Sequence, residues 1–115
     1  MKLPNSAKAR VDRRKITDYL LCESHPDGAS KAEFFGAFGF RVVDWDVLAD
    51  ALKKHGQENP VVTVIDSPFG PRYTVEGPLE APDGRRPVVV TVWIIDKGRT
   101  SPRLVTAYPG SRSGR

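Results

Sequence analysis

The sequence has few of the residues from which disulfide scaffolds and metal sites are built. It contains one cysteine, Cys22, and two histidines among 115 residues. A single cysteine cannot form an internal disulfide, and these three side chains are too few for the usual zinc sites. The sequence also lacks a glycine-rich phosphate loop and the glycine pattern of dinucleotide-binding proteins. We therefore expect a protein that uses neither a metal ion nor an organic cofactor.

Long hydrophobic runs are absent as well. No apolar stretch approaches the roughly 20 residues that a membrane-spanning helix needs, and the first residues lack the apolar core of a secretion signal. Hydrophobic residues make up 39% of the sequence and charged residues 28%, which is ordinary for a globular protein of one domain. We expect a single domain over residues 1–109, a flexible tail at 110–115, a cytoplasmic location and no membrane partner.

The net charge of +4 is unevenly distributed along the chain. Residues 1–15 carry six Lys or Arg residues against one acidic residue, and the last six residues add two arginines. Residues 16–109 hold ten basic and thirteen acidic residues. The basic character therefore lies at the ends, which argues against a nucleic-acid interface that covers the whole surface and leaves a local basic patch open.

Two short helices are expected before residue 40. Asp12 is expected to cap the first helix, because Val11 and Ile16 have the spacing of a hydrophobic staple around it. Ile16, Tyr19 and Leu20 then fall on one face of this helix, which is expected to pack on the core. Ser30 and Glu33 fit a capping box, in which each side chain bonds to the backbone of the other residue. This pattern predicts that Ser30 caps the second helix, and Phe34, Phe35 and Phe38 are expected to supply its buried side.

A third helix is expected over residues 44–55. Trp45, Leu48 and Leu52 recur at helical spacing, which predicts one buried face. His55 falls in the last turn, where a positive charge complements the helix dipole. We interpret His55 as a cation at the end of this helix.

After residue 60 the sequence changes to a β-type pattern. Strands are predicted at residues 61–66, 72–76, 88–95 and 103–108. The first two are separated by a turn rich in proline and glycine, so they should pair as a hairpin. The third is apolar on both faces, which predicts a central position in the sheet.

His25 and Lys31 are the first candidates for chemistry. His25 lies in a predicted loop before the second helix, and Lys31 falls in the first turn of that helix. A cation is disfavoured there by the helix dipole unless an anion such as a phosphate joins it. The structural alternative is a solvated Lys31 and a His25 that caps its own loop. A Cys22–His25 pair of nucleophile and base is a further alternative to a structural thiol at Cys22.

The last two strands offer a second group of polar side chains. Strict alternation places Leu104, Thr106 and Tyr108 on one face of the last strand. By the same rule Thr91 and Trp93 share a face of the preceding strand. The alternative for Thr91 is a β-branched residue that serves packing alone.

These residue types suit the cleavage of RNA without a metal ion. In that reaction the 2′-hydroxyl attacks the adjacent phosphorus and the 5′-oxygen leaves. It needs a proton-transfer group, a cation for the developing negative charge, and hydroxyl donors for the phosphate oxygens. His25 would serve as the base or acid and Lys31 as the cation, while Thr106 and Tyr108 would orient the phosphate or assist the leaving group.

Several short segments resemble a bacterial family of domains of unknown function, whose members occur alone or as the last domain of polymorphic and contact-dependent toxins. The segments that carry the resemblance, in chain order, are Lys2-Leu3-Pro4-Asn5, Tyr19-Leu20-Leu21, His25-Pro26, Lys31-Ala32, Phe34-Phe35, Gly39-Phe40, Thr91-Val92-Trp93-Ile94 and Arg103-Leu104-Val105-Thr106-Ala107-Tyr108-Pro109. Their order and spacing are more specific than any one of them.

The family resembles the barnase–EndoU–colicin–RelE ribonuclease toxin fold. That resemblance implies an α+β domain with three N-terminal helices packed on a four-stranded antiparallel sheet, and metal-independent endoribonuclease activity. Its motifs map onto His25, Lys31, Thr106 and Tyr108 as catalytic residues, and we add Thr91, Trp93 and Arg103 as residues expected to contact the substrate.

The leading hypothesis is a toxin-like ribonuclease with RNA as substrate and a cognate antitoxin or immunity protein as partner. The alternative is a non-catalytic module that binds protein or nucleic acid within a two-protein complex. Clustering of the four catalytic candidates would favour the enzyme, and scattering would favour the binding module.

Overall fold

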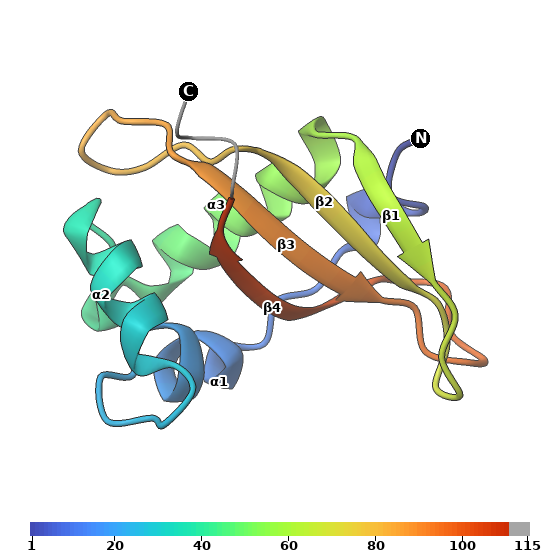
Figure 1. Ribbon diagram of the computed structural model, residues 1–115, viewed down its shortest axis with the longest axis horizontal. Helices are drawn as coiled ribbons and strands as arrows, with labels where there is room; N and C mark the ends of the chain where they lie inside the picture. Colours follow the sequence, from blue (N-terminus) through green and yellow to red (C-terminus); the bar gives the residue numbers. More distant parts are fainter. Residues whose placement is uncertain (111–115) are drawn as a thin grey trace.

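The computed structural model describes residues 1–110, in which helical segments precede a sheet (Figure 1). The helical segments are η1 Ser6–Lys8, α1 Arg13–Lys15, the π-helical turn η2 Ile16–Leu20, α2 Ala29–Ala37, η3 Val42–Asp44 and α3 Trp45–Glu58; the strands are β1 Val61–Ile65, β2 Arg72–Pro78, β3 Val88–Ile94 and β4 Arg103–Pro109. The expected α+β class with three α-helices and a four-stranded antiparallel sheet is confirmed. Because α3 ends only at the middle of the chain, the helices are not confined to its N-terminal part.

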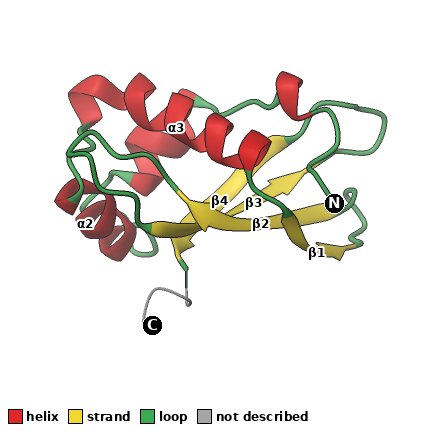
Figure 2. Cartoon of the chain, turned by 90° about the horizontal axis from the view of Figure 1, so that it is seen from above, coloured by secondary structure: helices red, strands yellow, loops and turns green. Residues whose placement is uncertain are grey.

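The sheet has the strand order β1-β2-β3-β4, and all neighbouring strands are antiparallel. The predicted hairpin of β1 with β2 and the interior position of β3 are both present. Within the described chain, α3 lies over one face of the sheet and the opposite face carries no helix (Figure 2). We call the latter the open face.

The core forms between the helices and the covered face of the sheet. Leu48 and Leu52, predicted on the buried face of the third helix, are completely buried, and so is Trp93, whereas Trp45 is only partly buried. Phe34 and Phe38 were expected in the core too, but they are only partly buried against it. Phe35, which was expected on the same buried side of α2, is completely buried.

A bulge in β4 changes which side chains share a face. Val92 pairs with Thr106 and Trp93 pairs with Leu104, so Val105 is an extra residue in the ladder. Directly paired residues lie on the same face, and Leu104 is therefore buried against the helices with Trp93, whereas Thr106 is on the open face. The expected alternation of Leu104 with Thr106 and Tyr108 is wrong, because it assumed an unbroken strand.

The start of α2 also differs from the expectation. The helix begins at Ala29 with Gly28 as its N-cap residue, and no side chain caps it. The capping box of Ser30 and Glu33 is therefore not formed. The amide groups of Asp27 and Gly28 donate instead to the ring of His25, which satisfies the backbone before Ser30 is reached.

His55 is buried, and the interpretation as a helix-end cation is wrong. Its Nε2 lies 2.8 Å from the carbonyl oxygen of Val89 and 3.1 Å from that of Gly77, and its Nδ1 lies 3.1 Å from the Thr91 hydroxyl. Nε2–H therefore donates to the carbonyls, while Nδ1 accepts from Thr91, whose oxygen accepts from the indole N–H of Trp93 at 2.8 Å. This network gives both ring nitrogens of a neutral imidazole a hydrogen-bond partner. Burial lowers the pKa of His55 from 6.5.

The buried imidazole predicts a loss of stability in mild acid. The unfolded chain takes up a proton on His55 near pH 6.5, whereas the folded protein resists protonation to a lower pH. The free energy of unfolding should thus receive the full contribution of this residue above pH 6.5. Below that pH it should fall by up to about 1.4 kcal/mol per pH unit, until the pKa of the folded state is reached.

Urea denaturation across this pH range measures the effect. In His55→Gln, which lacks the buried imidazole, the free energy of unfolding should depend less on pH than in the wild type. His25→Gln changes the other histidine and should retain the pH dependence of the wild type. Identical profiles for wild type and His55→Gln would show that this imidazole does not couple folding to pH.

The expected flexible tail at 110–115 lies outside the described residues except for Gly110. Gly110 is buried, and its N–H donates to the carbonyl of Val88 at 2.8 Å, so the ordered chain extends at least this far.

No helix within residues 1–110 combines the length and apolar character needed to cross a membrane.

Candidate functional site

Tyr19 connects three of the four predicted catalytic residues. Its hydroxyl lies 3.1 Å from the hydroxyl of Thr106, and its ring centroid lies 5.0 Å from that of His25 in an edge-to-face arrangement. The Nζ atom of Lys31 lies 5.5 Å from the centre of the same ring, and that of Lys15 lies 5.3 Å from it. We call these five residues the Tyr19 cluster.

The local fold explains why Tyr19 reaches both the loop and the sheet. Tyr19 belongs to η2, in which the N–H of Leu21 bonds to the carbonyl of Ile16 at 2.8 Å, five residues back. A π-helical turn widens the helix and shifts its side chains relative to an α-helix. The shift fits the position of Tyr19, whose hydroxyl meets the edge strand β4 through Thr106.

Gly28 holds the His25 loop against Tyr19. A Cβ atom at residue 28 would overlap the carbonyl oxygen of Tyr19 and press against its ring. Only glycine therefore permits this close approach of two backbones. The close contact fixes the distance between Tyr19 and the residues that flank Gly28 in the chain, His25 and Lys31.

His25 is held by its own loop, as the structural alternative predicted. Its Nδ1 accepts the amide hydrogens of Asp27 at 2.9 Å and of Gly28 at 3.0 Å. With Nδ1 occupied as an acceptor, the neutral ring carries its hydrogen on Nε2. In this orientation His25 can donate a hydrogen bond to a ligand through Nε2, but it cannot act as a base there.

Lys31 and Lys15 give the cluster its positive charge. Lys31 donates one hydrogen bond to the carbonyl of Asp27 at 3.2 Å, which leaves two of its three ammonium hydrogens for other acceptors. Within residues 1–110 neither lysine forms an ion pair with a carboxylate. Two ammonium groups beside one aromatic ring, with no carboxylate paired to them among residues 1–110, make the local potential of the cluster positive.

Thr106 and Tyr108 share the open face of β4. Thr106 pairs with Val92 and Tyr108 with Val90, so the two hydroxyl-bearing side chains are two residues apart on one face, about 7 Å along the strand. The side chain of Tyr108 is 39% exposed. Within the described chain it makes no hydrogen bond to the Tyr19 cluster, so the structure places Tyr108 beside the cluster rather than in it.

The three predicted substrate-contacting residues lie elsewhere. Thr91 and Trp93 are completely buried, and their polar atoms bond to each other and to His55. Arg103 holds both oxygens of Asp96, at 2.8 and 3.1 Å, and this contact lowers the pKa of Asp96. Thr91 and Trp93 thus serve the core, as the packing alternative for Thr91 predicted, and Arg103 is committed to an ion pair.

Cys22 does not pair with His25 as a nucleophile would with its base. Its sulfur contacts the hydroxyl of Ser24 at 3.4 Å, and the hydrogen bonds from Ser24 lower the pKa of the thiol. The Nδ1 atom of His25 is occupied by the backbone of its own loop. The geometry gives no support to a Cys–His pair.

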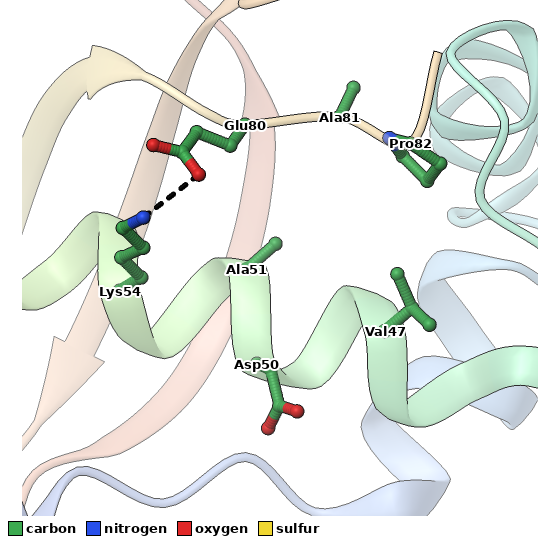
Figure 3. Close-up of a pocket in the computed structure, with 7 residues that line it drawn as sticks. All are labelled: Val47, Asp50, Ala51, Lys54, Glu80, Ala81 and Pro82. Carbon is green, nitrogen blue, oxygen red and sulfur yellow. Dashed lines mark hydrogen bonds and ion pairs between the residues drawn. The ribbon is translucent and has the colours of Figure 1, made fainter. Parts of the chain in front are cut away.

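A separate surface pocket of about 320 Å³ opens between α3 and the segment after β2 (Figure 3). Its lining residues are Val47, Asp50, Ala51, Lys54, Glu80, Ala81 and Pro82. Lys54 and Glu80 form an ion pair of 2.8 Å across it. None of the predicted site residues lines this pocket.

Two members of the Tyr19 cluster were missed by sequence reasoning. Tyr19 was assigned to the buried face of the first helix, and Lys15 was counted only within the basic N-terminal segment. A tyrosine on an otherwise aliphatic helix face was the available signal, because a buried phenol needs a polar partner. The partner, Thr106, lies 87 residues away in the sequence.

Among residues 1–110, no group of three or more His, Cys, Asp or Glu side chains is placed to hold a metal ion.

The fold and the cluster together define a small α+β domain with a cationic, hydroxyl-bearing site beside the edge strand of its sheet. The chain belongs to a family described as Domain of unknown function (DUF6883), whose model matches residues 2–111. No curated protein matches the chain in sequence.

A solved structure shares the fold. It is a chain from a complex of a contact-dependent growth inhibition toxin with its immunity protein from Klebsiella pneumoniae 342. The match has a TM-score of 0.70 and 22% sequence identity, and it covers 92% of this chain and 97% of that chain. At this identity the likeness concerns the fold.

Proposed function

We propose that this protein is a toxin-like ribonuclease that cleaves RNA by attack of the 2′-hydroxyl and without a metal ion. The observation that carries the proposal is the convergence of His25, Lys31 and Thr106 on Tyr19. In this proposal the Lys31 ammonium, the His25 N–H and the Thr106 hydroxyl contact one phosphate beside Tyr19. These are the groups that a phosphate needs when it gains negative charge in a transition state.

The bond changes follow from the cleavage chemistry of RNA. The 2′-oxygen forms a bond to phosphorus, its proton passes to a water molecule, and the bond from phosphorus to the 5′-oxygen breaks. The Lys31 ammonium stabilises the negative charge that develops on the phosphate, and the departing 5′-oxygen takes a proton from the Tyr108 hydroxyl, which regains one from solvent. His25 donates through Nε2 to a non-bridging oxygen, in accordance with the tautomer set by its loop.

Thr106 and Tyr108 complete the proposed catalytic group from the sheet. The Tyr19 hydroxyl can donate to Thr106, which leaves the hydrogen of the Thr106 hydroxyl for a phosphate oxygen. Tyr108 is the more exposed residue of the two and would contact the substrate from the next position on the open face. Neither Thr91 nor Trp93 enters this site, because both are buried.

The toxin assignment is supported by the structural neighbour, which comes from a complex of a growth inhibition toxin and its immunity protein. We infer that a cognate immunity or antitoxin protein binds this chain and blocks the Tyr19 cluster. The shared fold supports this inference, and the cluster supplies the surface on which such a blocker would act.

Analysis of the products of RNA cleavage tests the proposed function. Purified protein should convert labelled RNA into fragments that end in a 2′,3′-cyclic phosphate, and a chelator should not slow the reaction. DNA should survive, because it lacks the nucleophilic hydroxyl. Cleavage that requires a metal ion, or equal cleavage of DNA, would contradict this mechanism.

A non-catalytic partner-binding module is the second candidate. It is favoured by the internal bonds of His25 and Lys31, both of which serve their own loop. It is also compatible with the neighbour, since a toxin–immunity complex contains a non-toxic member. Expression in bacterial cells separates the two candidates: growth should stop with the wild type and continue with Lys31→Ala if the protein is a toxic nuclease.

A further inference from the structure

The helix α1 consists of three consecutive cations, Arg13, Arg14 and Lys15. Arg13 and Arg14 are exposed, and Lys15 is half-buried because its chain reaches the ring of Tyr19. The guanidinium of Arg13 lies 5.7 Å from the ring centre of Trp45. This cation–π contact orients the Arg13 side chain and leaves its positive charge in place. This basic helix is therefore continuous with the Tyr19 cluster through Lys15.

The tertiary structure fixes the segment before α1 against the sheet. Arg10 forms a parallel bridge with Arg103, in which its N–H donates to Pro102 at 2.8 Å and its carbonyl accepts from Leu104 at 3.0 Å. The chain then continues into α1, which contacts β4 (Figure 1). The basic N-terminal segment is thus held beside the strand that carries Thr106.

The charges along this segment are largely uncompensated. Within the described chain, Arg10, Arg13, Arg14 and Lys15 form no ion pair. Asp12 directly precedes α1, Asp44 and Asp46 flank Trp45, Asp18 accepts a hydrogen bond from Thr17, and Asp96 is held by Arg103. Because residues 16–109 are net acidic, the positive field of the protein is concentrated beside its candidate site.

We propose that α1 binds the backbone phosphates of an RNA strand next to the phosphate held by the Tyr19 cluster. The ligand class rests on the proposed ribonuclease function, and the location rests on the bridge of Arg10 and the contact of Lys15 with Tyr19. The substrate is then an extended strand, because a dinucleotide offers no phosphate for Arg13 and Arg14. Contacts of this kind hold the strand in place and do not read its sequence.

Fluorescence anisotropy with a labelled single-stranded RNA oligonucleotide, at several salt concentrations, tests the proposal. The double variant Arg13→Ala/Arg14→Ala is compared with Arg41→Ala/Arg86→Ala, which removes the same charge from two exposed arginines elsewhere. Each phosphate contact to a single strand contributes about 0.7 to the slope of log affinity against log salt. The α1 variant should therefore reduce that slope by roughly 1.4, and the control should leave it unchanged.

The length of the substrate gives a second readout that separates this proposal from the proposed function. Cleavage of a dinucleoside monophosphate by the α1 variant should equal that of wild type, whereas cleavage of the oligonucleotide should show a raised KM. An α1 variant that binds the oligonucleotide with the wild-type slope would overturn the proposal and leave the cleavage chemistry intact. RNA binding through α1 without any cleavage would support it and overturn the proposed function.

The alternative occupant is an acidic protein surface. Polyglutamate of similar length serves as the probe. Wild type should bind it more weakly than RNA, because Tyr19 and the spaced cations suit a strand with bases and phosphates. Equal affinity for the two polymers, lost equally in the α1 variant, would overturn RNA as the ligand.

Discussion

Replacing Lys31 by alanine should lower the kcat for RNA cleavage by about a hundredfold to a thousandfold, the effect of removing one donor from a preorganised anion site. The ammonium of Lys31 lies beside Tyr19, and no carboxylate of residues 1–110 pairs with it. Its charge is needed most when the phosphate gains negative charge, so kcat should change more than KM. Steady-state cleavage of a labelled oligonucleotide measures both constants.

Lys53→Ala provides the matched control for this prediction. Lys53 is also a half-buried lysine on a helix, and it lies on α3 instead of beside Tyr19. Its kinetic constants should equal those of the wild type, and both variants should unfold at similar urea concentrations. A raised KM with unchanged kcat in Lys31→Ala would assign the lysine to ground-state binding alone.

Replacing Leu48 by alanine should reduce the free energy of unfolding by about 2–5 kcal/mol. Leu48 is completely buried on the face of α3 that meets the core. The truncation removes apolar contact and leaves a cavity that the surrounding side chains fill only in part. For a domain of this size such a loss is a large share of the total, since typical stabilities are about 5–15 kcal/mol.

Val47→Ala is the neighbouring control on the same helix. Val47 is 43% exposed and lines the surface pocket of Figure 3, so its truncation should change the unfolding free energy by about 0.5 kcal/mol or less. Urea denaturation of both variants decides the matter. A loss of unfolding free energy in Leu48→Ala as small as that in Val47→Ala would contradict the packing of Leu48 in the core.

The class of fold followed from local patterns in the sequence. The strands at 61–65, 72–78, 88–94 and 103–109 were predicted to within a few residues, because β-branched runs and proline–glycine turns act locally. The interior position of β3 followed from its lack of a polar face. The α3 helix was likewise evident from apolar residues at helical spacing.

The composition of the candidate site was predicted only in part, and its arrangement was not predicted. His25, Lys31 and Thr106 were selected for their chemistry, and the structure brings them to one tyrosine. Tyr19 itself was assigned to packing, because a helix pattern cannot show a partner in a distant strand. The open-face position of Thr106 also depends on a bulge that side-chain alternation does not reveal.

His55 shows most clearly what only the tertiary structure decided. At the end of a helix its sequence context matches that of a solvated cation, yet it is buried and bonded to two carbonyls and Thr91. The sequence by itself determined the α+β class, the element order and the uneven charge, since these depend on neighbours along the chain. Contacts between distant segments determine the neutral state of His55, the position of Thr106 on the open face and the central role of Tyr19. These contacts exist only once the helices pack on the sheet.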